Sequence, residues 1–453
     1  MAPDRATDAA RLRQALAANP EDRIAWHNLA AAEGDLGNAQ ESEDAARRAI
    51  ALGLAAPETR LVLARALQNQ RHLDEAERAF EEAIRLRPAY VQAHRDLAQL
   101  RWMRTQDASI ALKRLREALR ATPRDADLRL VESIVVESAG DAAGALAAAE
   151  AGLAFAPHDR ALLRQASRLS SETGDANGAL ALAQRAASLA PGESAERIAL
   201  CEALFGLGRA SEANDIATAL VAKHPTSQYV IALQATAWRL LGDPRYASLH
   251  DYATLVVQQP LEVPEGWPGL DAFLADIAAE LEALHGFRTH PLQQSVRGGS
   301  QLPLRAPELA RPLVRALFGS ISRAVQRYLE TVGMGQDPLR SRNTGRFAIT
   351  EAWSIRLSAG GYHTDHIHPQ GWLSSALHLA LPPSVGTGGG GARAGWLRLG
   401  QPCFRTQPPL AADHFVKPRA GSLVLFPAYL WHGVEPFQDE KPRLTVAFDV
   451  LPA

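Results

Sequence analysis

The chain has 453 residues, of which 47% are hydrophobic and 22% are charged, and its formal net charge is −2. This length exceeds that of one ordinary domain, so we expect two or three domains with sizeable cores. The near-neutral charge predicts neither nucleic acid nor an anionic membrane as a partner. No apolar run approaches the roughly 20 residues of a membrane span.

The start of the chain and its cysteines favour a cytoplasmic protein. The segment from Met1 to Asp8 carries charged residues and lacks the apolar core of a signal peptide. The two cysteines, Cys201 and Cys403, lie far apart and neither belongs to a CxxC pair. We therefore expect no disulfide framework and a reducing compartment.

Residues 9–240 show an internal repeat. Prolines recur at intervals of 31 to 37 residues, and alanines lie twelve residues before five of them. A near-fixed period of this length is typical of a solenoid of helix pairs. We expect each proline to follow the second helix of a unit, because proline disfavours helix before it. The prolines are Pro20, Pro57, Pro88, Pro123, Pro157, Pro191 and Pro225, and the alanines are Ala76, Ala111, Ala145, Ala179 and Ala213.

This pattern resembles the tetratricopeptide repeat. Trp26 and Leu29 fit the start of one unit, and a later unit has the expected residues at Leu63, Ala64, Leu67, Ala76, Phe80, Ala83 and Pro88. The resemblance implies an all-α solenoid of stacked helix pairs. It also implies a groove that holds a peptide or a partner protein.

Residues 241–345 predict a helical segment packed on the domain that follows. Apolar residues recur with helical spacing over 270–284, and a longer helical stretch covers 310–332. Between them, the polar segment from His290 to Gln301 contains Arg297 and two glycines. We expect this segment to be a surface loop.

Residues 346–453 change to the alternating pattern of strands. Short strands are expected at 352–357, 375–381, 395–399, 421–426 and 443–450, and the glycine-rich run Gly386–Gly391 is expected to connect two of them. Many short strands without intervening helices favour a sandwich or a jelly-roll barrel.

Four potential metal ligands crowd one stretch of this region: His363, Asp365, His366 and His368. Because alternate residues of a strand share a face, His363 would lie with Asp365, and His366 with His368. Either pair would need a ligand from a distant strand, for which His432 is the candidate. Two histidines and one carboxylate on one side of an iron ion leave positions open for a co-substrate and oxygen.

Arg443 and Thr445 share a face of the last expected strand. A buried guanidinium beside a hydroxyl group is a suitable fork for a carboxylate. His378 alternates with leucines and is expected to be a core residue, whereas His414 is expected at the surface.

Together these motifs resemble the iron(II)- and 2-oxoglutarate-dependent dioxygenases, and most closely a prolyl-hydroxylase-like branch from bacteria and phages. The resemblance implies a double-stranded β-helix (jelly roll) with a helical layer. It implies that His366 and His432 bind iron, that Arg443 binds the distal carboxylate of 2-oxoglutarate, and that Thr445 assists.

The second ligand departs from the usual family pattern. His368 stands where most of these enzymes have aspartate, but the branch named above uses His-x-His-Pro, which favours the set His366, His368 and His432. His363 and Asp365 remain as alternative ligands or neighbours. Trp372 follows closely and would line the mouth of the site.

The resemblance implies an enzyme that uses Fe(II), 2-oxoglutarate and O2 to hydroxylate a substrate. The attached repeats favour a protein or peptide substrate recruited by their groove. Two alternatives stay open. The substrate would be a small molecule if the repeats serve assembly alone, and the protein would be a non-catalytic scaffold if its barrel is a degenerate sensor.

Overall fold

The computed structural model describes residues 5–385 and 393–453. The chain forms two compact units, unit 1 (Met1–Ala156) and unit 2 (Pro157–Ala453). The expected connection Gly386–Gly391 lies outside the described residues. Within the described parts, no helix combines the length and the apolar character needed to cross a membrane.

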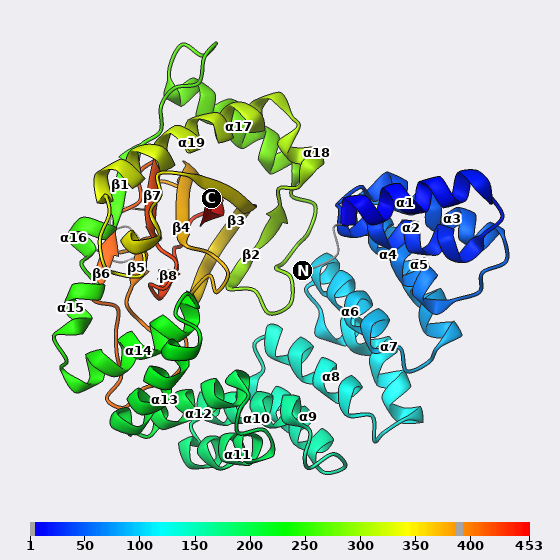
Figure 1. Cartoon of the computed structure of the whole chain (residues 1–453), viewed down its shortest axis with the longest axis horizontal. Helices are drawn as coiled ribbons and strands as arrows, with labels where there is room; N and C mark the ends of the chain where they lie inside the picture. The colour runs from blue at the N-terminus through cyan, green and yellow to red at the C-terminus, as the bar shows by residue number, and fades with distance from the viewer. Residues whose placement is uncertain (1–4, 386–392) are drawn as a thin grey trace. The chain divides into compact units, whose positions relative to one another are not determined.

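The helices of the first part of the chain are labelled in Figure 1, and within each unit consecutive helices of the solenoid pack against each other. Unit 1 contains α1 (Arg5–Ala18), α2 (Arg23–Asp35), α3 (Ala39–Ala51), α4 (Pro57–Asn69), α5 (Leu73–Leu86), α6 (Val91–Thr105), α7 (Ala108–Ala121), α8 (Ala126–Ser138) and α9 (Ala142–Leu153). Unit 2 continues the repeat with α10 (Arg160–Thr173), α11 (Ala176–Leu189), α12 (Ser194–Gly206), α13 (Ala210–Lys223) and α14 (Gln228–Leu241).

The alanines with the repeat period lie where two helices of a pair approach each other. Ala145 and Ala179 are fully buried. Their carbonyl oxygens accept hydrogen bonds from the hydroxyl groups of Ser133 and Ser167 on the preceding helix, each at 2.8 Å. Only a small side chain leaves room for this contact, which explains why alanine recurs. The predicted tetratricopeptide solenoid is confirmed.

Six of the seven prolines follow the end of a helix, but the expectation for Pro57 is wrong. Pro57 is the first residue of α4, whereas α3 ends six residues earlier at Ala51. Gly53 adopts a positive φ of 85° just beyond α3. Glycine in this conformation ends a helix, and proline suits the first turn of the next one.

Nine strands of the described residues form one antiparallel sheet, in the order β1-β7-β4-β9-β3-β8-β5-β6, with β2 paired to β3. The sheet curls into a half-barrel, consistent with a jelly roll, and so confirms the expected fold class. The strands are β1 (Val257–Pro260), β2 (Val296–Pro303), β3 (Phe347–His366), β4 (Leu373–Ala380), β5 (Leu397–Leu399), β6 (His414–Val416), β7 (Ser422–Pro427), β8 (His432–Val434) and β9 (Arg443–Pro452).

Helices cover one side of this sheet. The connecting helices are α15 (Arg245–Leu249), α16 (Tyr252–Leu255), α17 (Leu270–Leu284), α18 (Ala306–Leu309), α19 (Pro312–Val332) and a 3-10 helix (Arg340–Arg342). Figure 1 shows α17 and α19 along the curved sheet, and Phe273 and Tyr328 from these two helices are fully buried in the shared core.

The segment expected to be a surface loop is partly a strand, because two glycines let it lie against a bend in β3. A Cβ atom at Gly299 would lie 2.2 Å from the Arg356 carbonyl oxygen, and one at Gly298 would lie 2.9 Å from Gly361 Cα. The pairing of β2 with β3 shifts between Arg297 and Gly299, opposite this bend. The bend directs the end of β3 toward β8.

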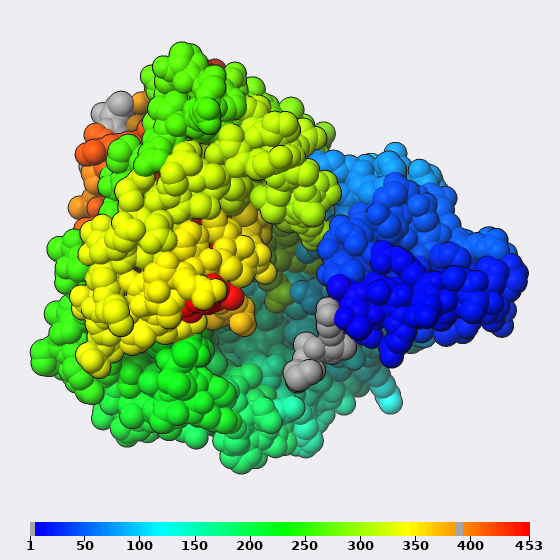
Figure 2. All heavy atoms as spheres, turned by 45° about the horizontal axis from the view of Figure 1, so that its top comes forward, coloured from blue at the N-terminus to red at the C-terminus, as the bar shows by residue number. Residues whose placement is uncertain are grey.

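The end of the chain completes the sheet. Pro452 on β9 pairs with Phe347 at the start of β3. In Figure 2 the red C-terminal residues reach the surface beside the yellow segment that contains this start. The long strand β3 thus pairs with β9 over its first half and with β8 at its end.

We expect replacement of a buried repeat alanine to destabilise unit 1. Ala145→Leu should lower the free energy of unfolding by about 1–3 kcal/mol, because the added atoms overpack the contact between α8 and α9. Ala143→Leu, on the exposed side of α9, is the matched control and should change it by less than about 0.5 kcal/mol. Urea unfolding followed by circular dichroism measures both, and equal effects would contradict the assigned packing.

Candidate metal centre

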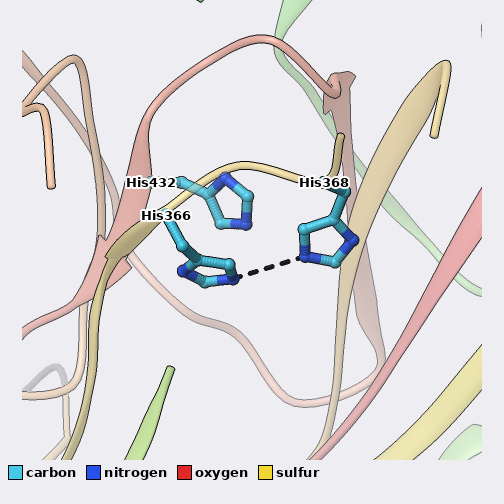
Figure 3. A group of neighbouring side chains, drawn as sticks. All are labelled: His366, His368 and His432. Carbon is cyan, nitrogen blue, oxygen red and sulfur yellow. Dashed lines mark hydrogen bonds between the residues drawn. The ribbon is translucent and has the colours of Figure 1, made fainter. Parts of the chain in front are cut away.

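Three histidines converge from two neighbouring strands. His366 ends β3 and pairs in register with His432, the first residue of β8, while His368 lies just beyond β3. One nitrogen of each ring lies within 4.8 Å of those of the other two. Figure 3 shows the rings with these nitrogens turned toward one another.

The second nitrogen of each ring donates a hydrogen bond to an acceptor within the fold. His366 Nδ1 donates to the Thr364 carbonyl oxygen and His432 Nδ1 donates to the Leu430 carbonyl oxygen, both at 2.9 Å. His368 Nδ1 makes a short hydrogen bond to the carboxylate of Asp449. Because these acceptors require a donor, each Nδ1 carries the hydrogen and each Nε2 keeps its lone pair.

The distance between two of these Nε2 atoms fits a shared ion. His366 Nε2 and His368 Nε2 lie 3.3 Å apart, the separation marked by the dashed line in Figure 3. Two lone pairs at this distance repel unless a proton or a metal ion lies between them. Two ligand nitrogens, each about 2.1 Å from one metal ion, lie roughly 3.0–3.4 Å apart at ordinary coordination angles.

Burial keeps the imidazoles of His366 and His432 neutral, which is the form that binds metals. Burial, and then the neighbouring His368, lower the pKa of His366 to about 3. Burial, followed by His366 and His368, also holds the pKa of His432 well below its usual 6.5. At neutral pH both rings therefore present a free lone pair.

The alternative pair, His363 and Asp365, is not brought together around one point. A β-bulge in β3 between His363 and His366 interrupts the alternation of faces that the sequence pattern assumes. His363 Nδ1 lies 3.0 Å from the hydroxyl of Ser295, which is also 3.3 Å from His366 Nε2. Asp365 instead accepts two hydrogen bonds, of 2.8 and 2.9 Å, from Arg398.

Arg443 lies on β9 and is 1% exposed. Its Nη2 atom donates to His378 Nδ1 at 3.3 Å, and its Nε atom has no hydrogen-bond partner among the described residues. Burial lowers the pKa of Arg443 to about 10, so the group stays charged at neutral pH. Within the same parts of the chain it forms no ion pair, and such an uncompensated buried cation is costly.

Two polar side chains complete the surroundings of Arg443. Thr445 is buried two residues further along β9 and pairs in register with His378 of β4. His378 accepts from Arg443 at Nδ1, so its Nε2 carries the hydrogen, and this buried donor also lacks a partner among the described residues. Arg443 Nε and His378 Nε2 are thus two buried donors without a partner among the described residues, which suits an anion with several oxygen atoms.

Sequence reasoning missed two of these contacts and misplaced one residue. Asp449 shares a strand face with Arg443 and Thr445, so strand alternation was the signal that could have found it. His378 is buried as expected, but it contacts Arg443. Trp372 is 1% exposed and donates to the Leu339 carbonyl oxygen at 3.0 Å, so it packs in the core and does not line a mouth.

Comparison with protein families agrees with these motifs. Residues 351–449 match the family described as "Putative 2OG-Fe(II) oxygenase", and residues 61–108 and 170–237 match two tetratricopeptide repeat families. Its helical part is thus similar to tetratricopeptide repeat families, and its β-rich part is similar to this oxygenase family. The predicted resemblance to both families is therefore confirmed. No curated protein matches the chain.

Solved structures of repeat proteins are similar to the helical part. A thermophilic TPR protein of Thermus thermophilus is 21% identical, covers 40% of this chain and 98% of its own, and has a TM-score of 0.31. A tetratricopeptide repeat protein of Parabacteroides merdae is 15% identical, with a TM-score of 0.37. The match covers 51% of this chain and 87% of that protein. YrrB, a TPR protein with an unusual peptide-binding site, is 18% identical, with a TM-score of 0.28. The match covers 42% of this chain and 96% of that protein.

The ion pair of Asp365 provides a test of the site's surroundings. We expect Arg398→Ala to lower the free energy of unfolding by about 3–5 kcal/mol, because it leaves the Asp365 carboxylate buried without a partner. Arg356→Ala removes the partially exposed ion pair with Glu282 and should cost at most about 1 kcal/mol. Urea denaturation compares the two variants, and a small loss in Arg398→Ala would show that Asp365 is free for another role.

Proposed function

We propose that this protein is an iron(II)- and 2-oxoglutarate-dependent dioxygenase that hydroxylates a side chain of a protein or peptide. The observation that carries the proposal is the convergence of three Nε2 lone pairs, together with a buried arginine that has no anionic partner among the described residues and whose charge acts on the adjacent His363. Three histidines alone would suit zinc as well. The unpaired arginine favours a site that also binds a carboxylate.

His366, His368 and His432 would hold the metal through Nε2. Their Nδ1 hydrogen bonds fix the tautomer and the orientation of each ring before any ion binds. The bond from His368 to Asp449 brings a negative charge to the ligand that replaces the usual aspartate. Asp449 would thereby make His368 a stronger ligand without touching the metal.

Arg443 would bind the distal carboxylate of 2-oxoglutarate. Its planar guanidinium can donate two parallel hydrogen bonds, and its charge would be compensated once the carboxylate binds. Thr445 and the Nε2 hydrogen of His378 would donate to the same group. The surrounding core, which includes the fully buried Phe426 packed edge-on to His432 at 4.9 Å, would keep water from the site.

Iron bound with 2-oxoglutarate and oxygen supplies the chemistry that couples decarboxylation of the keto acid to hydroxylation of a C–H bond. The chain supplies position and charge. The proposed protein or peptide substrate rests on the repeats, because tetratricopeptide repeats generally bind such partners and present an extended concave surface.

The proposal is tested by product formation without a known substrate. Full-length protein with Fe(II), ascorbate and labelled 2-oxoglutarate should form succinate. His366→Ala should lose both the bound metal and this turnover, because it removes one of three ligands, whereas His363→Ala should keep its metal content. Metal retention by His366→Ala, with loss in His363→Ala, would instead assign the ligands to the other pair. The proposal would be refuted if the unaltered protein bound no metal and formed no succinate.

Arg443→Met should separate keto-acid binding from metal binding. We expect the 2-oxoglutarate concentration for half-maximal turnover to rise roughly 10- to 100-fold, the equivalent of about 1.5–3 kcal/mol for a charged hydrogen bond. Metal affinity should not change. Thermal stability without ligands should not fall, because the substitution removes an unpaired buried charge.

Arg356→Met is the matched control for this variant. Arg356 lies on β3 and its side chain is 34% exposed, so its replacement should leave the keto-acid requirement unaltered. An unchanged requirement in Arg443→Met would remove Arg443 from the co-substrate site.

A further inference from the structure

The strand segments that carry the three histidines have a second face, and this face lies against the repeats. Ile367 stands between His366 and His368, and Trp431 directly precedes His432. Successive side chains of an extended chain point to opposite faces, so both residues point away from the histidine rings. Both are buried, and they form one hydrophobic cluster with Ala232 of α14.

Trp431 is held on α14 by a directed hydrogen bond. Its indole Nε1 donates to Thr236 Oγ1 at 3.0 Å. The Thr236 hydroxyl itself donates to the Ala232 carbonyl oxygen at 2.8 Å, so its lone pair is aimed at the indole. The rings of Tyr229 and Phe404 pack edge-on against Trp431, at centroid distances of 5.4 and 5.5 Å.

Further contacts within unit 2 join α14 and α12 to the segment 400–411. Arg239, near the end of α14, donates to the carbonyl oxygens of Gly400 and Ala411, each at 2.9 Å. Phe205 of α12 stacks on Phe404, and its carbonyl oxygen accepts a hydrogen bond of 2.9 Å from the backbone of Gln407. The segment 400–411 therefore joins the last repeats to the strands around the histidines.

We infer that the repeat helix α14 is a structural part of the metal centre, with Thr236 and Trp431 as its positioning residues. This inference rests on the proposed function. The contact of Trp431 with Thr236 sets the position of His432, and the contact of Ile367 with Ala232 sets the position of His366 and His368. Together they fix how closely the three Nε2 atoms approach. The last repeat thus has a role beyond recruitment of a partner.

The test is the metal affinity of the full-length Thr236→Val variant, measured with Co(II) in competition with a chromophoric chelator. Valine keeps the shape of threonine but leaves the buried Trp431 N–H without an acceptor. We expect the affinity to fall about tenfold, within the range seen when outer hydrogen-bond partners of metal ligands are removed. The absorption band of the bound Co(II) should shift, because the ligand geometry changes. Thr236→Ser keeps the acceptor and should restore both readouts.

Thr218→Val is the matched control. Thr218 is exposed on α13 and accepts a hydrogen bond from Gln234 of α14, away from the cluster, so its replacement should leave the affinity unchanged. Should Thr236→Val not fold, Trp431→Phe removes the same hydrogen bond from the other side and carries the same expectation. If these variants keep an unaltered affinity and spectrum while His366→Ala abolishes binding, the inferred role of α14 is wrong and the proposed metal site is unaffected. Retained binding in His366→Ala would refute the proposed metal site itself.

Discussion

The structure around the candidate site depends on where three imidazole hydrogens are fixed. Each Nδ1 hydrogen is committed to a carbonyl oxygen or a carboxylate, so three Nε2 lone pairs face one another in a buried space. Lone pairs that face one another at this distance repel, and the repulsion is stronger away from bulk water. A cation among them removes this penalty. The strands therefore hold the three rings in positions that a bound cation would stabilise. The bulge in β3 and its pairing with β8 maintain these positions.

Charge balance extends this constraint to the buried Arg443. A divalent ion and Arg443 would place three positive charges in the core, whereas Asp449 is one negative charge at His368 and Asp365 is already neutralised by Arg398. A ligand with two carboxylates would restore neutrality at both positions. 2-Oxoglutarate has this charge, and the unused donors of Arg443 and His378 match one of its ends. Bound 2-oxoglutarate would thus compensate the charges that the folded chain alone leaves without partners.

Periodic features were predictable from the sequence, and features that depend on long-range pairing were not. The spacing of alanines such as Ala145 predicts the solenoid because each repeat packs against its neighbours in the same way. The sequence pattern also predicts that His366 and His432 approach each other, and they lie paired at the facing ends of two strands. Strand alternation failed at His363 and Asp365, because a single bulge in β3 breaks it. The contact of His378 with Arg443 depends on which strands are neighbours, and no local pattern encodes that order.

Two short backbone segments, 366–368 and 431–432, each carry candidate ligands on one side and contacts with α14 on the other, so the proposed metal centre and this last repeat helix are not independent parts. Ile367 is bonded directly to His366 and His368, and Trp431 to His432, and the pairing of His366 with His432 restricts independent movement of these segments. A displacement of α14 is therefore transmitted to the ligands on the opposite face. By thermodynamic reciprocity, an ion that favours converged ligands must also favour the docked position of α14. A partner on the repeats would change metal affinity only if it binds the docked and displaced forms of α14 with different strength. Recruitment and loading of the metal would then be coupled through Trp431 and Thr236, without any contact between partner and ion.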